Sequence, residues 1–449
     1  MIDPKINILF ASIPADGHFN PLSGLALFLK QQGHNVRWYT GSSYRSKVAQ
    51  LGIPFYPFLK AVEINQNNID ELYPERAQIK SAISKIRFDI RNLFLKNING
   101  NLEDILDIKL HFDFDVLVCD SGFMAFDIVQ ELFNTPAVVL GIAPIPEASI
   151  DLPPYGLGLL PGNGMIGRLR DSLLRSTIPR LLFGDSTRCY NDIIRPYGLP
   201  QIKDSIFNMI VRKPALFLQS GVPGFEYPRR DLHPNVRFVG PLLPARLRNP
   251  PVFYFAKFCA NYEKTILISQ GTMDNKNPQK LIIPSIEAFV NSNYFLIVAT
   301  GGQHTASLYN RFPHENILIV DFIDYNSALP YADLFVSSGG YGSVMLSLNH
   351  GVPVLAAGKH EGKNEIVARI EYFKFGVNLR TESPTSAQIR KGAEKIWSDP
   401  QYKMNVKKIK EQFAEYAPFP LCERNIIDIT KSYEVNKLGN PAKVHHRSS

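Results

Sequence analysis

A histidine and an aspartate that are far apart in the sequence each follow a short apolar run. His18 comes soon after residues 6–13, and Asp120 follows residues 116–119. Such runs are typical of buried parallel strands, and open α/β sheets bind ligands just beyond the carboxyl ends of their strands. A neutral imidazole accepts a proton near pH 7, and a carboxylate can fix its tautomer. We therefore predict that His18 is a general base oriented by Asp120.

The residues after His18 predict a helix over 22–32. Asn20 suits the cap position and Pro21 the first helical position, while Gly33 suits the residue after the end. Either polar residue can instead have a structural role. The histidine would then cap this helix, and the aspartate would satisfy the start of another.

A glycine-rich turn in the last third of the chain predicts an anion site. The apolar residues 334–337 lead into Ser338-Gly339-Gly340-Tyr341-Gly342-Ser343, and a helix is expected over 344–350, ended by Gly351-Val352-Pro353. Glycines at a helix start let backbone N–H groups approach a phosphate, and the helix dipole favours negative charge there. A diphosphate is the natural guest. A purely structural turn after a buried strand is the alternative.

Two successive series of alternating strand and helix patterns can position these residues. With 449 residues, the chain is also longer than a single domain with one hydrophobic core usually is. We expect two parallel sheets covered by helices. The predicted strands lie near 6–13, 35–40, 116–119, 137–141 and 215–219, and near 265–269, 294–299, 317–320, 334–337 and 353–356. The expected domains are residues 1–238 and 253–418, joined by a proline-rich linker at 239–252.

Composition is that of a globular protein, with 20% charged and 45% hydrophobic residues. No apolar run approaches the roughly 18–20 residues of a membrane span, and no signal peptide is expected. Four scattered cysteines indicate reduced thiols and a cytoplasmic location. The net charge of +8 suits an anionic ligand but is too diffuse for nucleic acid. No metal site is predicted, because Asp113 and Asp115 enter the strand that ends at Asp120 and so lie at its opposite end.

Four stretches resemble the GT-B nucleotide-sugar glycosyltransferases, specifically the natural-product branch related to macrolide and plant UDP-dependent enzymes. They are residues 15–22, 117–120, 269–272 and 339–354, in the order found in that family. The resemblance implies two Rossmann-like, doubly wound parallel-sheet domains that face each other across a cleft. It places the acceptor in the N-terminal domain and the nucleotide sugar in the C-terminal domain. It also implies that a helix over 419–435 returns to the first domain, before a disordered tail at 436–449.

The resemblance implies inverting, metal-independent transfer of a sugar to a hydroxyl of an apolar small molecule such as a flavonoid, terpenoid or macrolide. UDP-glucose is the expected donor, and no other cofactor is needed. His18 and Asp120 would activate the hydroxyl, while N–H groups of Gly342 and Ser343 and hydroxyls of Ser343 and Thr272 would stabilise the leaving diphosphate. Phe322, unless it is a core aromatic, would stack on the nucleobase, and the Ile323 backbone would hydrogen-bond it. Further expected donor contacts are Gly17, Ser338, Gly340, Tyr341, Glu361 and Lys363.

The sequence departs from the family pattern in four places. Ser338 stands where many members have a histidine, and Leu346 replaces a polar residue that holds the ribose. The aspartate–glutamine pair that reads the sugar falls at Gly362-Lys363, beside Glu361, and Tyr325 replaces a glutamine. The expected reaction class survives these changes, but the identity of the sugar and of the nucleotide does not follow from the sequence.

Three other functions stay open. They are a lipid-directed glycosyltransferase or a nucleotide-sugar epimerase on the same fold, and a catalytically silent homologue that binds a partner enzyme. A silent binding protein has no need of a base and its orienting carboxylate. The expected oligomeric state is a monomer or a weak homodimer.

Residues 166–182 form a helix-like run that mixes apolar and basic side chains. The apolar residues of one face are Ile166, Leu169, Leu173, Leu174, Ile178, Leu181 and Leu182, and the arginines among them are Arg168, Arg170, Arg175 and Arg180. Such a helix can touch a membrane or shape the mouth of an acceptor site. We expect instead that the apolar face packs on a core and that the arginines are solvated.

Overall fold

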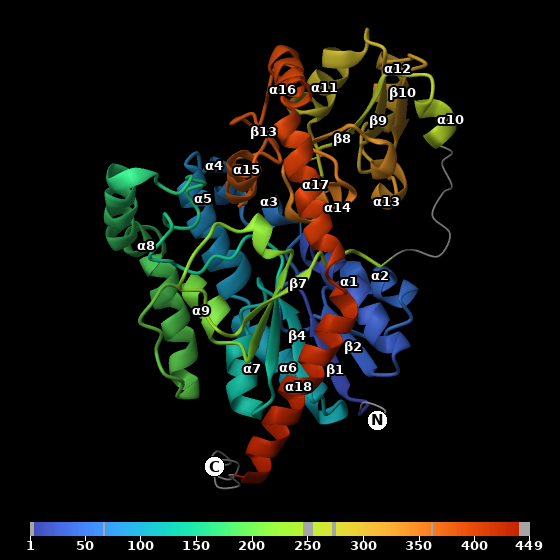
Figure 1. Cartoon of the computed structure of the whole chain (residues 1–449). Coiled ribbons are helices and arrows are strands. Elements are labelled where there is room, and N and C mark those ends of the chain that lie inside the picture. Colours follow the sequence, from blue (N-terminus) through green and yellow to red (C-terminus); the bar gives the residue numbers. More distant parts are fainter. Residues whose placement is uncertain (1–3, 66–67, 246–254, 272–274, 361, 440–449) are drawn as a thin grey trace.

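The computed structural model describes residues 4–65, 68–245, 255–271, 275–360 and 362–439. Within these ranges the chain forms two α/β domains, each built on a parallel sheet (Figure 1). The predicted fold class, two doubly wound parallel-sheet domains, is confirmed.

The first sheet has seven strands among the described residues, in the order β3-β2-β1-β4-β5-β6-β7. Successive residues of β1 belong to two different cores, Ile8 and Phe10 to one, Leu9 and Ala11 to the other. Helices therefore cover both faces, which explains why the strands read as continuous apolar runs. The strands are β1 (Asn7–Ala11), β2 (Asn35–Thr40), β3 (Phe55–Pro57), β4 (Val116–Asp120), β5 (Ala137–Gly141), β6 (Leu216–Ser220) and β7 (Val236–Gly240).

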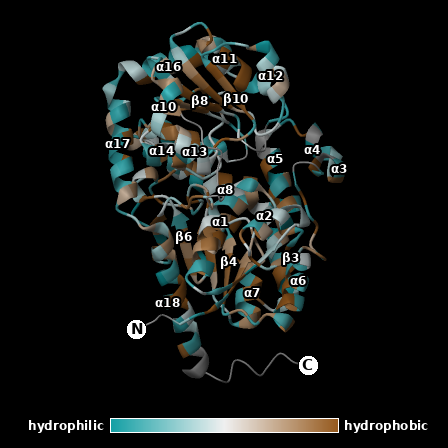
Figure 2. Ribbon diagram, turned by 90° about the vertical axis from the view of Figure 1, so that its right-hand side faces the viewer, coloured by the Kyte–Doolittle hydropathy of each residue, from teal (hydrophilic) through white to brown (hydrophobic). Residues whose placement is uncertain are grey.

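The second sheet has six described strands in the order β10-β9-β8-β11-β12-β13, again with a core on each face. In Figure 2 the strands are mostly brown, for hydrophobic, whereas outer helices such as α17 carry much teal, for hydrophilic. The strands are β8 (Lys264–Ser269), β9 (Tyr294–Ala299), β10 (Ile317–Val320), β11 (Leu334–Ser337), β12 (Val354–Ala356) and β13 (Gly376–Asn378).

Helices connect the strands and cover both sheets. Those of the first domain are α1 (Asp16–Gln31), α2 (Arg45–Gln50), α3 (Ile69–Leu72), α4 (Pro74–Gln78), α5 (Ala82–Asp89), α6 (Ile98–His111), α7 (Phe126–Phe133), α8 (Gly164–Ile194) and α9 (Ile206–Arg212), with a π-helical segment η2 (Ile90–Leu95). Those that follow are α10 (Phe255–Cys259), α11 (Ile282–Phe289), α12 (Thr305–Arg311), α13 (Tyr325–Ala328), α14 (Tyr341–His350), α15 (Lys363–Tyr372), α16 (Ser386–Ser398), α17 (Pro400–Ala414) and α18 (Pro418–Gly439). None of the described helices combines the length and apolar character needed to cross a membrane.

Two helices begin earlier than predicted. α1 starts at Asp16 rather than at residue 22, so Asn20 is not its cap and Pro21 lies inside it. The acidic Asp16 in the first turn favours this start, and the local Asn-Pro signal was misleading. α14 starts at Tyr341 rather than at residue 344. In consequence His18 and the glycine turn both belong to the first turns of helices.

The predicted boundaries around the linker and the C-terminal helix also shift. β7 extends to Gly240, into the linker predicted from 239, because Val239 is buried against the first sheet and Pro241 follows the strand end. α18 continues to Gly439, past the predicted end at 435. It contacts α1 and β7 of the first domain, where Cys422 and Ile426 join the core (Figure 1). Residues 440–449 lie outside the described ranges.

The expectation that the apolar face of residues 166–182 packs on a core is wrong for most of that face. Ile166, Leu169, Leu173 and Leu181 of α8 are exposed. The buried residues of α8 are concentrated in its C-terminal half, at Phe183, Ser186, Tyr190 and Ile194, with Asp171 alone in the N-terminal half. Amphipathic spacing predicted the helix but did not reveal that four of the seven apolar residues of this face are exposed.

Candidate active site

The two predicted polar residues lie where the strand order of the first sheet reverses. β1 pairs with β2 on one side and with β4 on the other. His18 follows β1 in the first turn of α1, and Asp120 ends β4. This is the topological switch point, where parallel sheets leave a crevice for ligands.

His18 and Asp120 are in direct contact. Nδ1 of His18 lies 2.6 Å from Oδ1 of Asp120; the histidine side chain is 25% exposed and the aspartate side chain is fully buried. Backbone N–H groups of Ile13, at 3.1 Å from Oδ2, and Gly122, at 2.7 Å from Oδ1, hold the carboxylate. Because an ionised carboxylate only accepts hydrogen bonds, Nδ1 must carry the proton. The lone pair therefore lies on Nε2, as a general base requires.

Two neighbours of this pair were not predicted from the sequence. Gly122 packs against it so closely that a Cβ there would lie 2.9 Å from both Oδ1 of Asp120 and Cε1 of His18. The ring of Phe94 lies with its centroid 6.3 Å from that of His18 and comes from the π-helical segment η2. Such segments often occur at functional sites, but no simple sequence pattern predicts one. Phe94 gives the base an apolar neighbour.

The glycine turn occupies the corresponding place in the second sheet, where β11 pairs with β8 on one side and β12 on the other. Gly340 is the N-cap of α14, and no described side chain caps the helix. The N–H groups of Tyr341, Gly342 and Ser343 are the first three of the helix, which have no partner within it. A Cβ at Gly342 would meet no atom within 4 Å. The helix start is thus open to an anion.

The hydroxyls of two serines predicted to contact the donor are directed to backbone carbonyls. Oγ of Ser338 donates to the carbonyl of Gln270 at 2.8 Å, which joins the turns after β8 and β11. Oγ of Ser343 donates to the carbonyl of Gly340 at 2.9 Å. Each hydroxyl has one proton, so in this geometry neither can donate to a diphosphate. The backbone N–H groups are left as the donors of the turn.

The Tyr341 side chain points into the first domain rather than toward the turn. Its hydroxyl donates to the carbonyl of Ser220 and accepts from Nε2 of Gln219 at 3.0 Å, and burial raises its pKa. Both partners end β6 of the first sheet. Tyr341 therefore holds the start of α14 against the first domain, and α14 also contacts α1.

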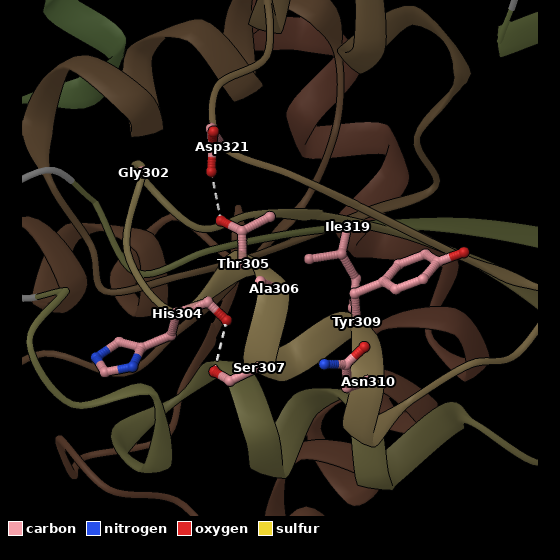
Figure 3. Close-up of a pocket in the computed structure, with 9 residues that line it drawn as sticks. All are labelled: Gly302, His304, Thr305, Ala306, Ser307, Tyr309, Asn310, Ile319 and Asp321. Carbon is pink, nitrogen blue, oxygen red and sulfur yellow. Dashed lines mark hydrogen bonds between the residues drawn. The ribbon is translucent and has the colours of Figure 1, made fainter.

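Phe322 is not a core aromatic, since 69% of its surface is exposed. Its ring lies just beyond β10, where a Cβ at Gly302 would be 3.2 Å from it. Next to Gly302 is a cavity of about 730 Å³, in which Thr305 donates to the carboxylate of Asp321 (Figure 3). The residues that line this cavity include neither His18 nor the glycine turn. Ile323 is half-buried and packs on the core of the second domain.

Two of the remaining predicted contacts lie in the first turns of helices α1 and α15. Gly17 is exposed in the first turn of α1. Lys363 is the first residue of α15 and is half-buried. Thr272 and Glu361 lie outside the described residues.

A buried ion-pair cluster, which no sequence pattern indicated, joins the two domains. The guanidinium of Arg369 on α15, with a side chain 3% exposed, bonds Glu226 at 2.9 and 3.0 Å and Glu365 at 3.1 Å. Burial lowers the pKa of Arg369, but the two carboxylates raise it by more, so it lies above its ordinary value. Oε1 of Glu365 also accepts the N–H groups of Gly156 and Gly158, each at 2.8 Å. The cluster thus fixes the loop after β5 to a helix of the second domain.

The chain is similar to known proteins over most of its length. A family model described as erythromycin biosynthesis protein CIII-like, C-terminal domain, matches residues 289–425. The chain is 32% identical over 409 residues to 4'-demethylrebeccamycin synthase of Lentzea aerocolonigenes, covering 91% of this chain and 95% of that protein. It is 28% identical over 427 residues to UDP-glycosyltransferase 2 of Phaeomoniella chlamydospora, covering 91% and 92% of the two chains.

Among solved structures, CalG4, the calicheamicin glycosyltransferase, has the same fold, with a TM-score of 0.67 and 17% identity over 98% of this chain and 100% of that one. Sequence identity over nearly the whole length and two facing switch points thus lead to one conclusion: this chain belongs to the GT-B family of natural-product glycosyltransferases.

Proposed function

We propose that this glycosyltransferase moves glucose from UDP-glucose to a hydroxyl of an apolar small molecule, with inversion and without a metal ion. The contact between His18 and Asp120, opposite the open start of α14, is the observation that supports it most directly. The similarity to UDP-glycosyltransferase 2 of Phaeomoniella chlamydospora supports a UDP-linked donor. The exposed ring of Phe322 supplies a face on which a nucleobase can stack.

The proposed reaction creates positive charge on His18 and negative charge on the leaving diphosphate, and each charge has a group to stabilise it. The acceptor hydroxyl gives its proton to Nε2 of His18 as its oxygen bonds to the anomeric carbon, and the buried Asp120 carboxylate stabilises the imidazolium. The bond from the anomeric carbon to the diphosphate breaks, and its electron pair leaves with the diphosphate. The N–H groups and dipole of α14 face that new charge. One such displacement inverts the anomeric centre.

Product stereochemistry tests this proposal. UDP-glucose has an α-linked sugar, so inverting transfer should give a β-glucoside, recognised by proton NMR of the anomeric centre. An α-linked product would contradict a single displacement. UDP binding without transfer to any of a broad panel of acceptors would instead support the silent homologue.

Chelation should have little effect on the rate. We expect EDTA to change initial rates by no more than about twofold, because helix-end donors supply the stabilisation that a cation would give. Loss of activity that Mn²⁺ or Mg²⁺ restores would contradict this. Asp113 and Asp115 would be weak candidates for such a site, since Lys109 lies 2.6 Å from Asp113 and the N–H of Asn7 donates to Asp115 at 2.7 Å.

Because of Leu346, we expect the enzyme to accept donors with or without a 2′-hydroxyl on the ribose. Leu346 is 8% exposed within an apolar cluster on α14 and has no group to bond a 2′-hydroxyl. A charged hydrogen bond there would be worth about 1.5–3 kcal/mol. We therefore expect kcat/KM for UDP-glucose and dTDP-glucose to differ by less than about tenfold. A larger preference for UDP-glucose that 2′-deoxy-UDP-glucose abolishes would show that another residue contacts the ribose.

A further inference from the structure

The N-terminal half of α8 carries an apolar face that the described part of the chain leaves exposed. Met165 and Ile166 are 88% and 87% exposed, and Leu169 and Leu173 are 61% and 60% exposed. Their spacing of one, three and four residues places all four on one side of the helix. Singly exposed apolar residues are ordinary, but a contiguous group marks an interaction surface. We call these four residues the α8 apolar face.

This half of the helix and the turn that follows it are basic. Between residues 163 and 184 there are four arginines, Arg168, Arg170, Arg175 and Arg180, and a single acidic residue. That acid, Asp171, is 2% exposed, and its carboxylate accepts hydrogen bonds from Arg170 and from the N–H of Gly162. Arg168 and Arg180 are exposed. The helix surface is therefore positive and apolar at once.

Polar contacts, rather than a core, hold this half of the helix in place. Arg170 donates to the carbonyl of Leu160 at 2.8 Å, and Arg175 donates to the carbonyl of Leu152 at 2.9 Å. Both carbonyls belong to the loop that Glu365 fixes at Gly156. Figure 1 shows this part of α8 at the left edge of the first domain, away from both sheets. The apolar face is thus held outward.

We propose that the N-terminal half of α8 docks on the surface of an anionic membrane. An apolar face with arginines beside it lies naturally at the boundary between headgroups and acyl chains, and anionic lipids attract the arginines. A second copy of the chain is a poorer partner, because a two-fold interface would bring the same arginines against one another. Four side chains also fall short of the roughly 800 Å² per partner of a standard interface. Docking would bring the loop at residues 152–160 close to a bilayer.

Vesicle sedimentation of the full chain tests this directly. We expect binding to vesicles of phosphatidylcholine mixed with phosphatidylglycerol to be at least about tenfold tighter than to phosphatidylcholine alone. Binding should weaken strongly near 1 M salt, where the screening length falls to about 3 Å. No substrate is needed, so the result does not depend on the proposed reaction.

Two sets of variants separate the apolar and charged contributions. Glutamine at all four positions of the α8 apolar face should reduce binding by at least about tenfold. Arg168→Gln with Arg180→Gln should reduce the preference for anionic vesicles by roughly fivefold per arginine. All variants should keep the far-UV circular dichroism and the transferase rate on a soluble acceptor, since these residues lie outside the candidate active site.

Matched controls are available elsewhere on the surface. Leu106→Gln with Leu110→Gln changes exposed apolar residues of α6, and Lys403→Gln with Lys408→Gln removes exposed charges of α17. Both controls should bind anionic vesicles like the wild type. Failure of the wild type to bind them, or equal binding by the glutamine variant of α8, would overturn the proposal. A dimer in sedimentation velocity that this variant abolishes, without vesicle binding, would assign the face to a second copy instead.

Discussion

Replacing His18 with alanine should lower turnover roughly 10²–10⁴-fold, the usual contribution of a general base. The affinity for UDP should change by less than about twofold, because the base acts only as the acceptor hydroxyl attacks. Steady-state rates at saturating donor and acceptor, with UDP binding by calorimetry, separate the two quantities. A variant that kept more than about a tenth of wild-type turnover would remove His18 from this role.

His111→Ala is the matched control, since His111 is an exposed histidine in the last turn of α6. It should leave turnover unchanged. Asp120→Asn should lower turnover less than His18→Ala does, because an amide oxygen can still orient the imidazole. It cannot reproduce the carboxylate fully, since the two oxygens of Asp120 accept from His18, Ile13 and Gly122 and an amide offers only one acceptor.

Replacing Arg369 with methionine should destabilise the protein by about 3–5 kcal/mol, because it leaves the buried Glu226 and Glu365 carboxylates without their cation. Urea unfolding measures this. The chain has two tryptophans, one in each domain, Trp38 and Trp397. Fluorescence of the methionine variant with and without Trp397→Phe shows whether the domains lose stability together. Acceptor KM should rise more than donor KM, since Glu365 would hold the 156–158 loop less firmly, and this loop belongs to the first domain, in which we propose that the acceptor binds.

The exposed pair Arg311–Glu287, with N···O at 2.8 Å, supplies the control. Arg311→Met should cost less than about 1 kcal/mol, as exposed ion pairs generally do. Adding Glu226→Gln and Glu365→Gln to Arg369→Met should restore most of the stability, because no buried charge then lacks a partner. Equal losses for Arg369→Met and Arg311→Met would show that the buried cluster has no special part in joining the domains.

Local patterns were sufficient to predict much of this protein. Buried strands of a parallel sheet are apolar on both faces, so runs such as residues 116–119 are visible without a structure. The ends of those runs indicated where His18, Asp120 and the glycine turn would lie. Their positions could be predicted because ligand sites of such sheets follow the strand order rather than any single contact. The roles proposed for these residues stay predictions.

Short strands and the first residues of helices were harder to predict from the sequence. β3 and β13 have three residues each, and β7 is partly polar, so their main support is pairing with a neighbouring strand. α1 begins before Asn20 and Pro21, since the acidic Asp16 of its first turn favours an earlier start. α14 begins at Tyr341 without an acidic residue in its first turn. Such small local energies are easily outweighed by packing.

Only the tertiary structure decided which side chains face a substrate and which hold the domains together. The resemblance implied donor contacts at Ser338 and Tyr341. In this structure the Ser338 hydroxyl donates to a carbonyl 68 positions away and the Tyr341 hydroxyl to one 121 positions away. Arg369 meets Glu226 across 143 residues, and nothing in its local sequence distinguishes it from a solvated arginine. The physical reason is that a polar group taken out of water must find a partner, and that partner is chosen by long-range packing rather than by neighbours in the chain.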